Sequence, residues 1–425
     1  MQISSLVAFC VLTFLSTVTR ADDWPQWRGP ARDGTSKESG LLKKWPEKGP
    51  QQLWRSEEVG DGYSTPAVVA DRLYIMGNKG PADEFVRAMQ ASDGKPLWTT
   101  QVGKVGPNVP AMNYPGARST PTVERDVLYA LGSDGDLVCL QLADGAVKWK
   151  KNLRSDFGGK PGPWAYSESV LADGEVVVCT PGGADATLVA LNRTSGEVVW
   201  KCAVPGGDDA AYSSVVAVDV AGGRQYVQFL QKGLVGVDAK TGKFLWRYDQ
   251  TAKGSPANIP TPVARDGLVY SAAHRTGGGL IQLTADPKPG EQPKELYFDP
   301  KLPSAIGGSV LVGDHLYGTT SQVLVCADFK TGQIKWTERS IGAASTCFAE
   351  DRLYLHGENG DVALVAASPD GYVEKGRFTP PDMPDRGSSK AWAYPVIADG
   401  RLYIRELGAL WCYDIKGPPV VSSRD

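Results

Sequence analysis

Short apolar runs separated by turn residues recur along this chain from Tyr63 to its C-terminal end. The runs are roughly four to seven residues long, are rich in Val, Leu and Tyr, and are bounded by Gly, Asp or Asn. Such runs are typical of β-strands, and the Asp-Gly and Asp-Arg steps between them accommodate tight turns. The pattern therefore predicts an all-β protein made of many short strands.

The runs belong to a longer repeat. Eight segments open in a similar way, of which STPAVVADRLYIMG and STPTVERDVLYALG are the clearest. Five units close on Gly-x-x-x-Trp, and two further closings lack the tryptophan, near Tyr297 and near Val373. A period of about 40–50 residues with four strand-like runs in each unit is typical of the blades of a β-propeller.

Ring closure sets the number of blades. The eighth unit ends at residues 410–416 without a fourth run, whereas residues 51–59 form a run that carries Trp54 in the tryptophan position of the repeat. Pairing these two ends removes an open sheet edge. We therefore predict a single eight-bladed β-propeller over residues 51–417, closed by an N-terminal strand, with a leader at 22–50 packing on the ring and a tail at 418–425.

A four-stranded sheet of this kind cannot bury both of its faces alone, so each blade must stack on its neighbours. A tryptophan at the end of the outer strand supplies a large flat surface for that stacking. The residues expected to have this structural role are Trp54, Trp98, Trp149, Trp200, Trp246 and Trp336.

The N-terminus carries a targeting signal. Residues 6–15 form an apolar run that is too short to span a bilayer and has the length typical of a signal-peptide core. Thr19 and Ala21 place small residues where a signal peptidase cleaves, so we expect residues 1–21 to be removed. No later run approaches 18 apolar residues, which argues against a transmembrane segment. We predict a periplasmic or secreted protein, and a monomer.

Composition removes several classes of function. The formal net charge is -3, from 45 basic and 48 acidic residues without a basic block, which argues against nucleic-acid binding. Three His are too few to favour a His-based metal site.

An even number of Cys in the mature chain permits disulfides, but several of them occupy the same place in similar apolar runs, so buried free thiols are favoured. These cysteines are Cys139, Cys179, Cys202, Cys326, Cys347 and Cys412.

The closing segments resemble the tryptophan-docking motif of the pyrroloquinoline-quinone (PQQ) propeller superfamily. The segment GVDAKTGKFLW at 236–246 matches it best, and ALNRTSGEVVW and CADFKTGQIKW are close. The leader DDWPQWRGPARDGTS looks like that of exported PQQ-like repeat proteins, which resemble the outer-membrane assembly scaffold BamB. The resemblance covers nearly the whole mature chain and implies a PQQ-like propeller. Its members include both dehydrogenases and non-enzymatic scaffolds.

The dehydrogenases of this superfamily carry an adjacent Cys-Cys pair over the quinone, a Ca²⁺ site with Glu and Asn ligands, and a catalytic Asp. This chain has no Cys-Cys pair and no acidic cluster with calcium-loop spacing. The acid pair Asp208-Asp209 is expected to lie in a solvated loop, and the alternative is a cation ligand at the channel mouth. We therefore predict a non-catalytic binding or scaffold module without cofactor or metal. The alternative is a PQQ-like oxidoreductase with an altered site that uses PQQ and Ca²⁺.

No other catalytic set is present. The three histidines, His274, His315 and His356, fall in different units and are expected at the surface. Neither a G-x-S-x-G elbow nor an HExxH motif occurs. The sequence therefore predicts no catalytic and no metal-ligating residue.

The connections between blades carry the remaining candidates. In a propeller they run over one face toward the axis, and here they are aromatic and polar, with Tyr63, Tyr114, Glu168, Tyr212, Asn258 and Lys390 among them. The triplet Trp-Ala-Tyr occurs twice, at 164–166 and 392–394. Aromatic rings beside an Arg suit recognition of a protein segment or small ligand, so the predicted binding residues are Arg118, Trp164, Tyr166, Trp392 and Tyr394. The alternative is that these aromatics only plug the central channel.

Overall fold

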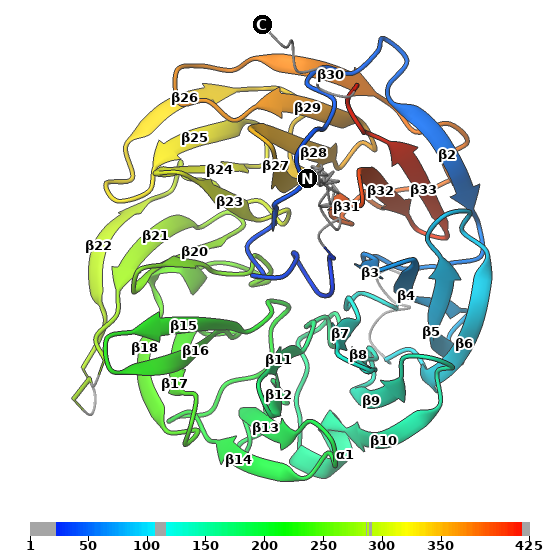
Figure 1. Cartoon of the computed structure of the whole chain (residues 1–425). Helices are drawn as coiled ribbons and strands as arrows, with labels where there is room; N and C mark the ends of the chain where they lie inside the picture. Colours follow the sequence, from blue (N-terminus) through cyan, green and yellow to red (C-terminus); the bar gives the residue numbers. More distant parts are fainter. Residues whose placement is uncertain (1–22, 107–115, 286, 289–290, 419–425) are drawn as a thin grey trace, which may run out of the picture.

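The computed structural model describes residues 23–418 apart from 107–115, 286 and 289–290. These residues form eight antiparallel sheets of four strands each, arranged as blades around one axis, and one sheet gains a short fifth strand (Figure 1). The predicted all-β, eight-bladed propeller is confirmed.

Within each blade the strands follow the sequence from the axis outward, except in the eighth. Blades one to four contain β3 Ala67–Val69, β4 Arg72–Lys79, β5 Asp83–Gln90 and β6 Pro96–Gly103; β7 Thr122–Glu124, β8 Val127–Leu131, β9 Asp136–Gln141 and β10 Val147–Asn152; β11 Leu171–Asp173, β12 Val176–Cys179, β13 Leu188–Asn192 and β14 Val198–Cys202; and β15 Val216–Val220, β16 Gly223–Phe229, β17 Leu234–Asp238 and β18 Phe244–Tyr248. Blades five to eight contain β19 Val263–Arg265, β20 Leu268–Ala273, β21 Gly277–Gln282 and β22 Lys294–Asp299; β23 Ser309–Val312, β24 His315–Thr319, β25 Leu324–Asp328 and β26 Ile334–Glu338; β27 Ala344–Ala349, β28 Arg352–Gly357, β29 Val362–Ala366 and β30 Glu374–Phe378; and β31 Val396–Ala398, β32 Arg401–Glu406, β33 Ala409–Asp414 and β2 Gln51–Ser56.

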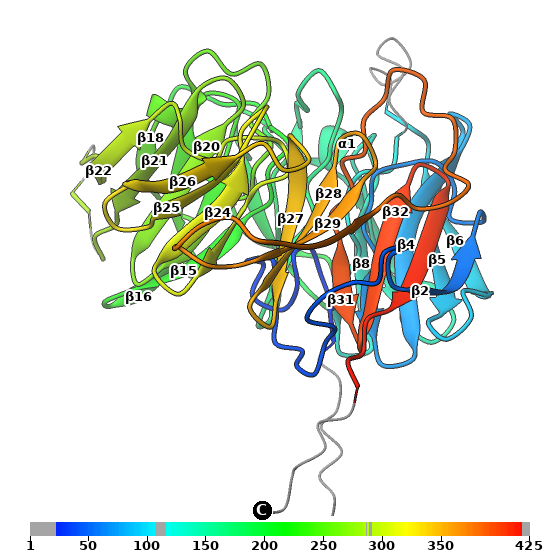
Figure 2. The same cartoon turned by 90° about the horizontal axis from the view of Figure 1, so that it is seen from above.

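Antiparallel pairing gives the ring two different faces. The turns between the first and second strands and between the third and fourth strands of each blade lie on one side, which we call the turn face. The connections between blades lie on the other side, the connection face. Within the described residues, two of them contain a short helix: α1 Leu153–Phe157 and the 3-10 turn η2 Gln250–Ala252. Figure 2 shows the ring edge-on, with the described ends of the chain on the turn face.

The N-terminal strand closes the ring as predicted. Strand β2 pairs with β33, and Trp54 stands opposite Cys412. The buried guanidinium of Arg405, in the last blade, also joins it to the first blade. It donates to the carbonyls of Ser64 and Met76, at 2.7 Å each. Burial lowers the pKa of Arg405 to about 9.

The outer tryptophans lie over glycines of the next blade. A Cβ atom on Gly94 would come within 2.7 Å of the Trp54 ring, and one on Gly145 within 2.5 Å of the Trp98 ring. The same arrangement places Trp149 over Gly196 and Trp200 over Gly242. Most of these indoles also donate to a carbonyl of the following blade, as Trp54 does to Ala91 at 3.0 Å. Only glycine permits this close approach, so the repeated Gly-x-x-x-Trp spacing couples neighbouring blades.

The aromatic residues at the ends of the fourth and fifth blades make different contacts. Trp246 donates to Gln225 of its own blade at 2.7 Å, since the fifth blade has no Thr-Gly-Lys turn to receive it. In the fifth blade itself Tyr297 occupies the tryptophan register opposite Leu280, and its hydroxyl donates to the Phe329 carbonyl of the next blade at 2.7 Å. A tyrosine can therefore replace the docking tryptophan.

The seventh blade has Gly376 in the register where other blades carry the aromatic residue. Trp45 of the leader fills that space, because a Cβ on Gly376 would lie 2.6 Å from the Cβ of Trp45. The Trp45 ring packs edge-on against Tyr354 and Phe378, with centroid distances of 5.9 and 5.2 Å. The leader thus completes the packing at a closing that the sequence shows as degraded.

The leader, residues 23–50, lies on the turn face and reaches the axis. Its strand β1 Thr35–Ser36 pairs in parallel with β27, which gives the seventh blade its fifth strand. Arg32 is buried and donates to the carbonyl of Ser169 at 2.6 Å, on the way into the third blade. Glu38 accepts the backbone N–H of Gly400, in the eighth blade, at 2.7 Å. One segment therefore ties blades that lie far apart around the ring.

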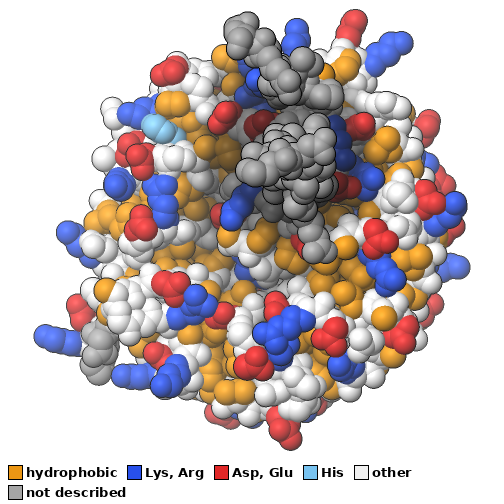
Figure 3. Space-filling model, in the orientation of Figure 1, with side chains coloured by type: hydrophobic (Ala, Val, Ile, Leu, Met, Phe, Trp, Pro, Cys, Tyr) orange, Lys and Arg blue, Asp and Glu red, His pale blue; other side chains and the backbone are white. Residues whose placement is uncertain are grey.

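The distribution of surface charge and the state of the cysteines match the expectations from the sequence. On the described part of the turn face, basic and acidic side chains are intermingled with apolar ones (Figure 3). The six predicted cysteines are all buried and free, so the prediction of buried thiols is confirmed. Burial raises the pKa of Cys139 to about 11 and that of Cys412 to about 12, which keeps these thiols protonated.

Candidate functional site

A cavity of about 260 Å³ lies on the axis of the ring at the connection face; we call it the axial cavity. Its lining is dominated by six aromatic residues: Trp27, Tyr63, Trp164, Tyr212, Trp392 and Tyr394. The other lining residues are Arg118, Ser167, Pro256, Ala257, Ile259, His274 and Ile306. Six of these thirteen described lining residues are therefore Trp or Tyr, and Arg118 is the one among them with a permanent charge.

The cavity is built mainly by the connections between blades. Tyr63 follows β2, Arg118 precedes β7 and Trp164 precedes β11. Tyr212 comes from the next connection, and Trp392 from the one that enters the eighth blade. Because outer-to-inner connections converge on the axis, side chains more than 300 residues apart in sequence meet in one wall.

The leader supplies part of the cavity from the opposite side. The indole of Trp27 donates to the hydroxyl of Thr261 at 2.8 Å and meets the Tyr394 ring edge-on, with a centroid distance of 4.7 Å. The Arg28 guanidinium lies 5.3 Å from the centroid of the same tyrosine. These contacts fix the orientation of Tyr394, whose hydroxyl also donates to the Ile306 carbonyl at 3.0 Å.

Four of the five predicted binding residues line this cavity: Arg118, Trp164, Trp392 and Tyr394. Tyr166 does not. Its side chain is 2% exposed, packs in the core between the second and third blades, and donates to the Pro181 carbonyl at 2.8 Å. Ala165 adopts a left-handed conformation, with φ of 65°, and the chain turns there between Trp164 at the cavity and Tyr166 in the core. The placement of Tyr166 in the binding surface is therefore corrected.

Of the other connection residues, some line the cavity and others are buried in the core. Tyr63 and Tyr212 line the cavity, whereas Asn258 is fully buried and donates to the Leu230 carbonyl at 2.7 Å. Glu168 is also buried, and burial raises its pKa to about 8. Lys390 is exposed at the connection face. Tyr114, like the predicted signal peptide at residues 1–21, lies outside the described residues.

Arg118 is held in the cavity wall by its neighbours. Its Nη1 donates to the Trp164 carbonyl at 2.6 Å, which couples the connection between the first and second blades to the one between the second and third blades. Glu84, at the start of β5, is fully buried, and its Oε2 accepts the N–H and the hydroxyl of Ser133 at 2.8 and 2.9 Å. Burial raises the pKa of Glu84 to about 7, and the charge of Arg118 opposes that shift.

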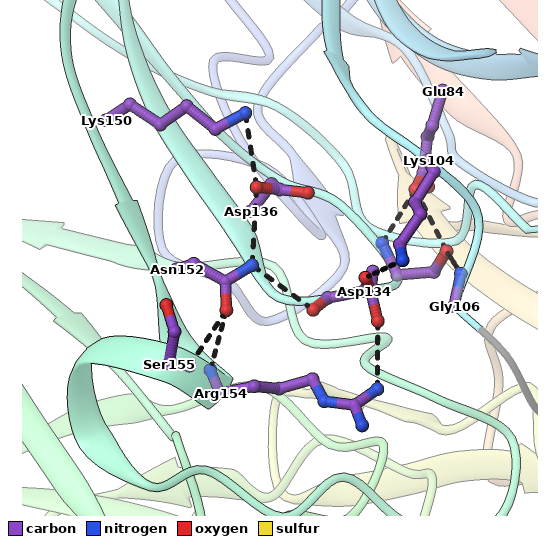
Figure 4. Close-up of polar contacts among 10 residues, drawn as sticks. Glu84, Lys104, Gly106, Asp134, Asp136, Lys150, Asn152, Arg154 and Ser155 are labelled. Atoms are coloured by element: carbon purple, nitrogen blue, oxygen red, sulfur yellow. Dashed lines mark hydrogen bonds and ion pairs between the residues drawn. The ribbon is translucent and has the colours of Figure 1, made fainter. Parts of the chain in front are cut away.

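A polar network around Glu84 anchors two of the connections (Figure 4). The hydroxyl of Ser133 accepts the N–H of Gly106, at the start of the first connection. Asp134 binds Arg154 at 2.9 Å, and Asn152 accepts the N–H groups of Arg154 and Ser155 at 3.0 Å each, which caps α1. These contacts hold Gly106, in the connection that contains Arg118, and α1, in the connection that contains Trp164.

Two expectations about polar residues are wrong. Of the pair Asp208-Asp209, expected in a solvated loop, Asp209 is exposed, but the Asp208 side chain is fully buried, forms an ion pair with Arg247 at 2.7 Å, and has its pKa raised by burial. His356 is not at the surface: its ring is fully buried, with Nδ1 2.8 Å from the Ala393 carbonyl and Nε2 3.3 Å from the Glu406 carboxylate. In both cases a nearby partner compensates for burial, which position within a repeat does not reveal.

The sequence analysis missed Trp27 and His274 as lining residues. Trp27 belongs to no repeat unit, and nothing in the spacing places the leader on the axis. The one available signal is the leader's content of two tryptophans and two arginines within residues 24–32. Such residues in a segment outside the repeat must find partners on the ring.

The described residues were also considered for a metal site and for a membrane-spanning helix. Across the described ranges, no group of three or more His, Cys, Asp or Glu is placed to hold a metal ion. Nor does any helix among them reach the length and apolar character required to cross a bilayer.

Comparison with known proteins gives one consistent family. The family model described as outer membrane protein assembly factor BamB matches residues 35–162 and 82–338. The outer membrane protein assembly factor BamB of Burkholderia pseudomallei is 25% identical over 294 residues, covering 68% of both chains. The quinoprotein alcohol dehydrogenase PedH of Pseudomonas putida is 22% identical over 297 residues, which cover 66% of this chain and 47% of the dehydrogenase. The crystal structure of BamB from Moraxella catarrhalis has a similar fold, with a TM-score of 0.57 and 17% identity over 83% of this chain and 94% of that one.

Proposed function

This chain belongs to the family described as outer membrane protein assembly factor BamB, and from that premise we propose that it is an exported, non-catalytic scaffold that binds a segment of a partner protein in its axial cavity. The observation that carries the proposal is the composition of the cavity wall. Six aromatic rings and one guanidinium converge there, and no carboxylate lies among the lining residues that the structure describes. Aromatic residues and Arg dominate the energetics of protein interfaces because they combine large contact area with directed hydrogen bonds.

The relatives support a role in assembly. Several of the similar proteins are named as outer membrane protein assembly factors, and the chain covers about two thirds of the Burkholderia relative. Export is part of the proposal, since such a factor acts outside the cytoplasm. N-terminal sequencing of the protein recovered from the native host should give a mature chain that begins at Asp22. A chain that retains residues 1–21 contradicts this part.

A quinoprotein dehydrogenase is the second candidate, and the similarity to PedH is the observation in its favour. The lining residues do not fit its cofactor. Calcium requires several oxygen ligands, usually carboxylates, and among the described residues no Asp, Glu, Asn or Gln lines the axial cavity. The chain also has no adjacent Cys-Cys pair. We therefore propose that the protein uses neither PQQ nor Ca²⁺.

Adding PQQ and Ca²⁺ to the purified protein separates the two candidates. A scaffold should lose all quinone absorbance on gel filtration and should show no dye-linked oxidation of alcohols or sugars. Retention of about one quinone per chain together with such oxidation would establish the dehydrogenase instead.

Photo-crosslinking in the native host tests the scaffold directly. A photoreactive amino acid in place of Lys390, which is exposed beside Trp392, should give a protein adduct of defined mass. The same amino acid in place of Lys240, which is exposed on the turn face, is the matched control and should not give that adduct. Equal adducts from both positions, or none from Lys390, contradict binding at the cavity.

A further inference from the structure

The wall of the axial cavity offers hydrogen-bond donors in excess of acceptors. Arg118 carries only donors on its guanidinium, and the indole of Trp164 carries one. The Trp164 nitrogen and the Ser167 hydroxyl are buried at the wall and have no hydrogen-bond partner among the described residues. Of the lining side chains in the described ranges, none is a carboxylate or an amide. A ligand that fits must supply acceptors and must not bring many donors of its own.

This asymmetry excludes several ligands that aromatic cavities otherwise accept. A quaternary ammonium ion suits an aromatic cage, but the positive charge of Arg118 in the wall opposes it. A saccharide would bury hydroxyl donors against a wall without carboxylate or amide acceptors, and each unsatisfied donor is unfavourable. An ordinary peptide brings one N–H for every carbonyl and meets the same difficulty.

Resting on the function proposed above, we infer that the axial cavity binds a proline-rich segment in the polyproline II conformation. Proline has a carbonyl acceptor and no N–H, so it matches a donor-rich wall without leaving a donor buried. Its ring is flat and apolar and packs on Trp and Tyr faces. The polyproline II helix is already extended before binding, so little conformational entropy is lost.

The aromatic platforms are held in place before any ligand arrives. The Trp164 ring meets Tyr212 edge-on, with a centroid distance of 5.7 Å, and the Tyr212 hydroxyl accepts the Trp164 backbone N–H at 3.1 Å. Tyr63 packs at 5.3 Å against Trp392, whose indole donates to Glu358 at 3.1 Å. Fixed platforms of this kind recognise a stiff ligand better than a flexible one, because neither partner has to be ordered on binding.

Calorimetric titration of the full mature chain tests the inference. The probes are acetyl-hexaproline amide and a length-matched acetyl-hexaserine amide, which has the same carbonyls but restores the N–H groups. We expect the proline peptide to bind at least tenfold more tightly than the serine peptide. Trp164→Ala should weaken it at least tenfold, whereas Trp200→Phe, on the rim of the ring, should not change it. Melting curves of both variants establish that each is folded.

Several outcomes overturn the inference. Equal affinity for the two peptides removes the role of the missing N–H. Stronger binding of indole-3-acetate than of the proline peptide assigns the cavity to a planar anion. If neither peptide binds while the Lys390 crosslink persists, the inference fails and the scaffold function stands. If the crosslink is absent as well, both fail.

Discussion

The rim and the centre of this ring use tryptophan in different ways. At the rim, Trp149 and Trp200 sit in the same strand register, each over a glycine of the next blade. At the centre, Trp27, Trp164 and Trp392 come from three segments that are not equivalent in the repeat. A repeated aromatic residue packs against a repeated partner and stabilises the ring. The aromatic residues at the centre pack on residues of other connections, as Trp164 does on Tyr212, and together they form the axial cavity.

The polar surroundings differ in the same way. The Trp149 indole donates to the Arg193 carbonyl at 3.1 Å, and that of Trp200 to the Ala239 carbonyl at 3.1 Å, so both of these rim tryptophans bind backbone groups. The centre depends on side chains, including Arg118 and the buried Glu84 behind it. Stability should therefore respond to changes at the rim, and binding and pH dependence to changes at the centre.

The largest effect is expected from removing the segment that serves both regions. Deleting residues 22–60 takes away β2, Trp45 and Trp54 at the rim together with Trp27 at the centre, and it leaves β33 with an open edge. Calorimetry should show loss of the cooperative melting transition of the mature chain that begins at residue 22. If the truncated chain melts at the same temperature, the ring does not depend on closure.

A single rim substitution comes next. Trp200→Ala removes a buried ring from the interface between the third and fourth blades and should lower the free energy of unfolding by about 3–5 kcal/mol. Trp200→Phe keeps part of the contact and should cost less. Denaturant unfolding measures both, and calorimetric titration with acetyl-hexaproline amide should give the same affinity for each variant. A loss of affinity without loss of stability would reverse the assignment of rim and centre.

The pH dependence separates the centre from the rim. The pKa of Glu84 is raised to about 7 by burial, so between its ordinary value of 4.5 and pH 7 the folded chain binds a proton that the unfolded chain has released. The contribution of this proton to the free energy of unfolding is therefore complete below pH 4.5. It decreases as the pH rises, by on the order of 3 kcal/mol at pH 7.

Glu84→Gln mimics the protonated group and should remove this part of the slope in unfolding measured from pH 4.5 to 7. Glu47→Gln, at an exposed position of the leader, is the control and should leave the slope unchanged. An unchanged slope in the Glu84 variant would show that this carboxyl is ionised throughout the interval.

The smallest effect on stability is expected at the cavity. Trp164 and Trp392 are only partly buried, so the double change to Ala should cost about 1–2 kcal/mol while abolishing peptide binding and the Lys390 crosslink. Near-ultraviolet circular dichroism and melting curves report the fold. If the double variant unfolds, these residues are plugs of the channel and the rim and the centre do not differ.

The ring could be predicted because its signal is repeated. Gly-x-x-x-Trp closings and the orphan run around Trp54 specify the blades and their closure, since each docking contact is local to two adjacent units. Four of the five predicted cavity residues were reachable from the convergence of the connections. Tyr166 was not, because the left-handed Ala165 reverses the direction of a side chain two residues from Trp164.

The contacts of the leader could not be predicted from the sequence for a related reason. Trp27 and Trp45 contact partners more than 200 residues away, and neither contact has a periodic counterpart in the sequence. Asp208 and His356 show the same limit for polar groups. Their partners, Arg247 and Glu406, are fixed by tertiary packing rather than by spacing.

The junction at Arg405 also sets an order of events during folding. Its guanidinium reaches the carbonyls of Ser64 and Gly60 across 341 and 345 residues of sequence. Contacts of such separation form late, since the intervening chain must first be organised. A chain synthesised from its N-terminus therefore holds residues 51–60 without their strand partner until β33 has been made. During that interval the newest and the oldest parts of the molecule both expose sheet edges, and this is when a holding chaperone has the most to protect.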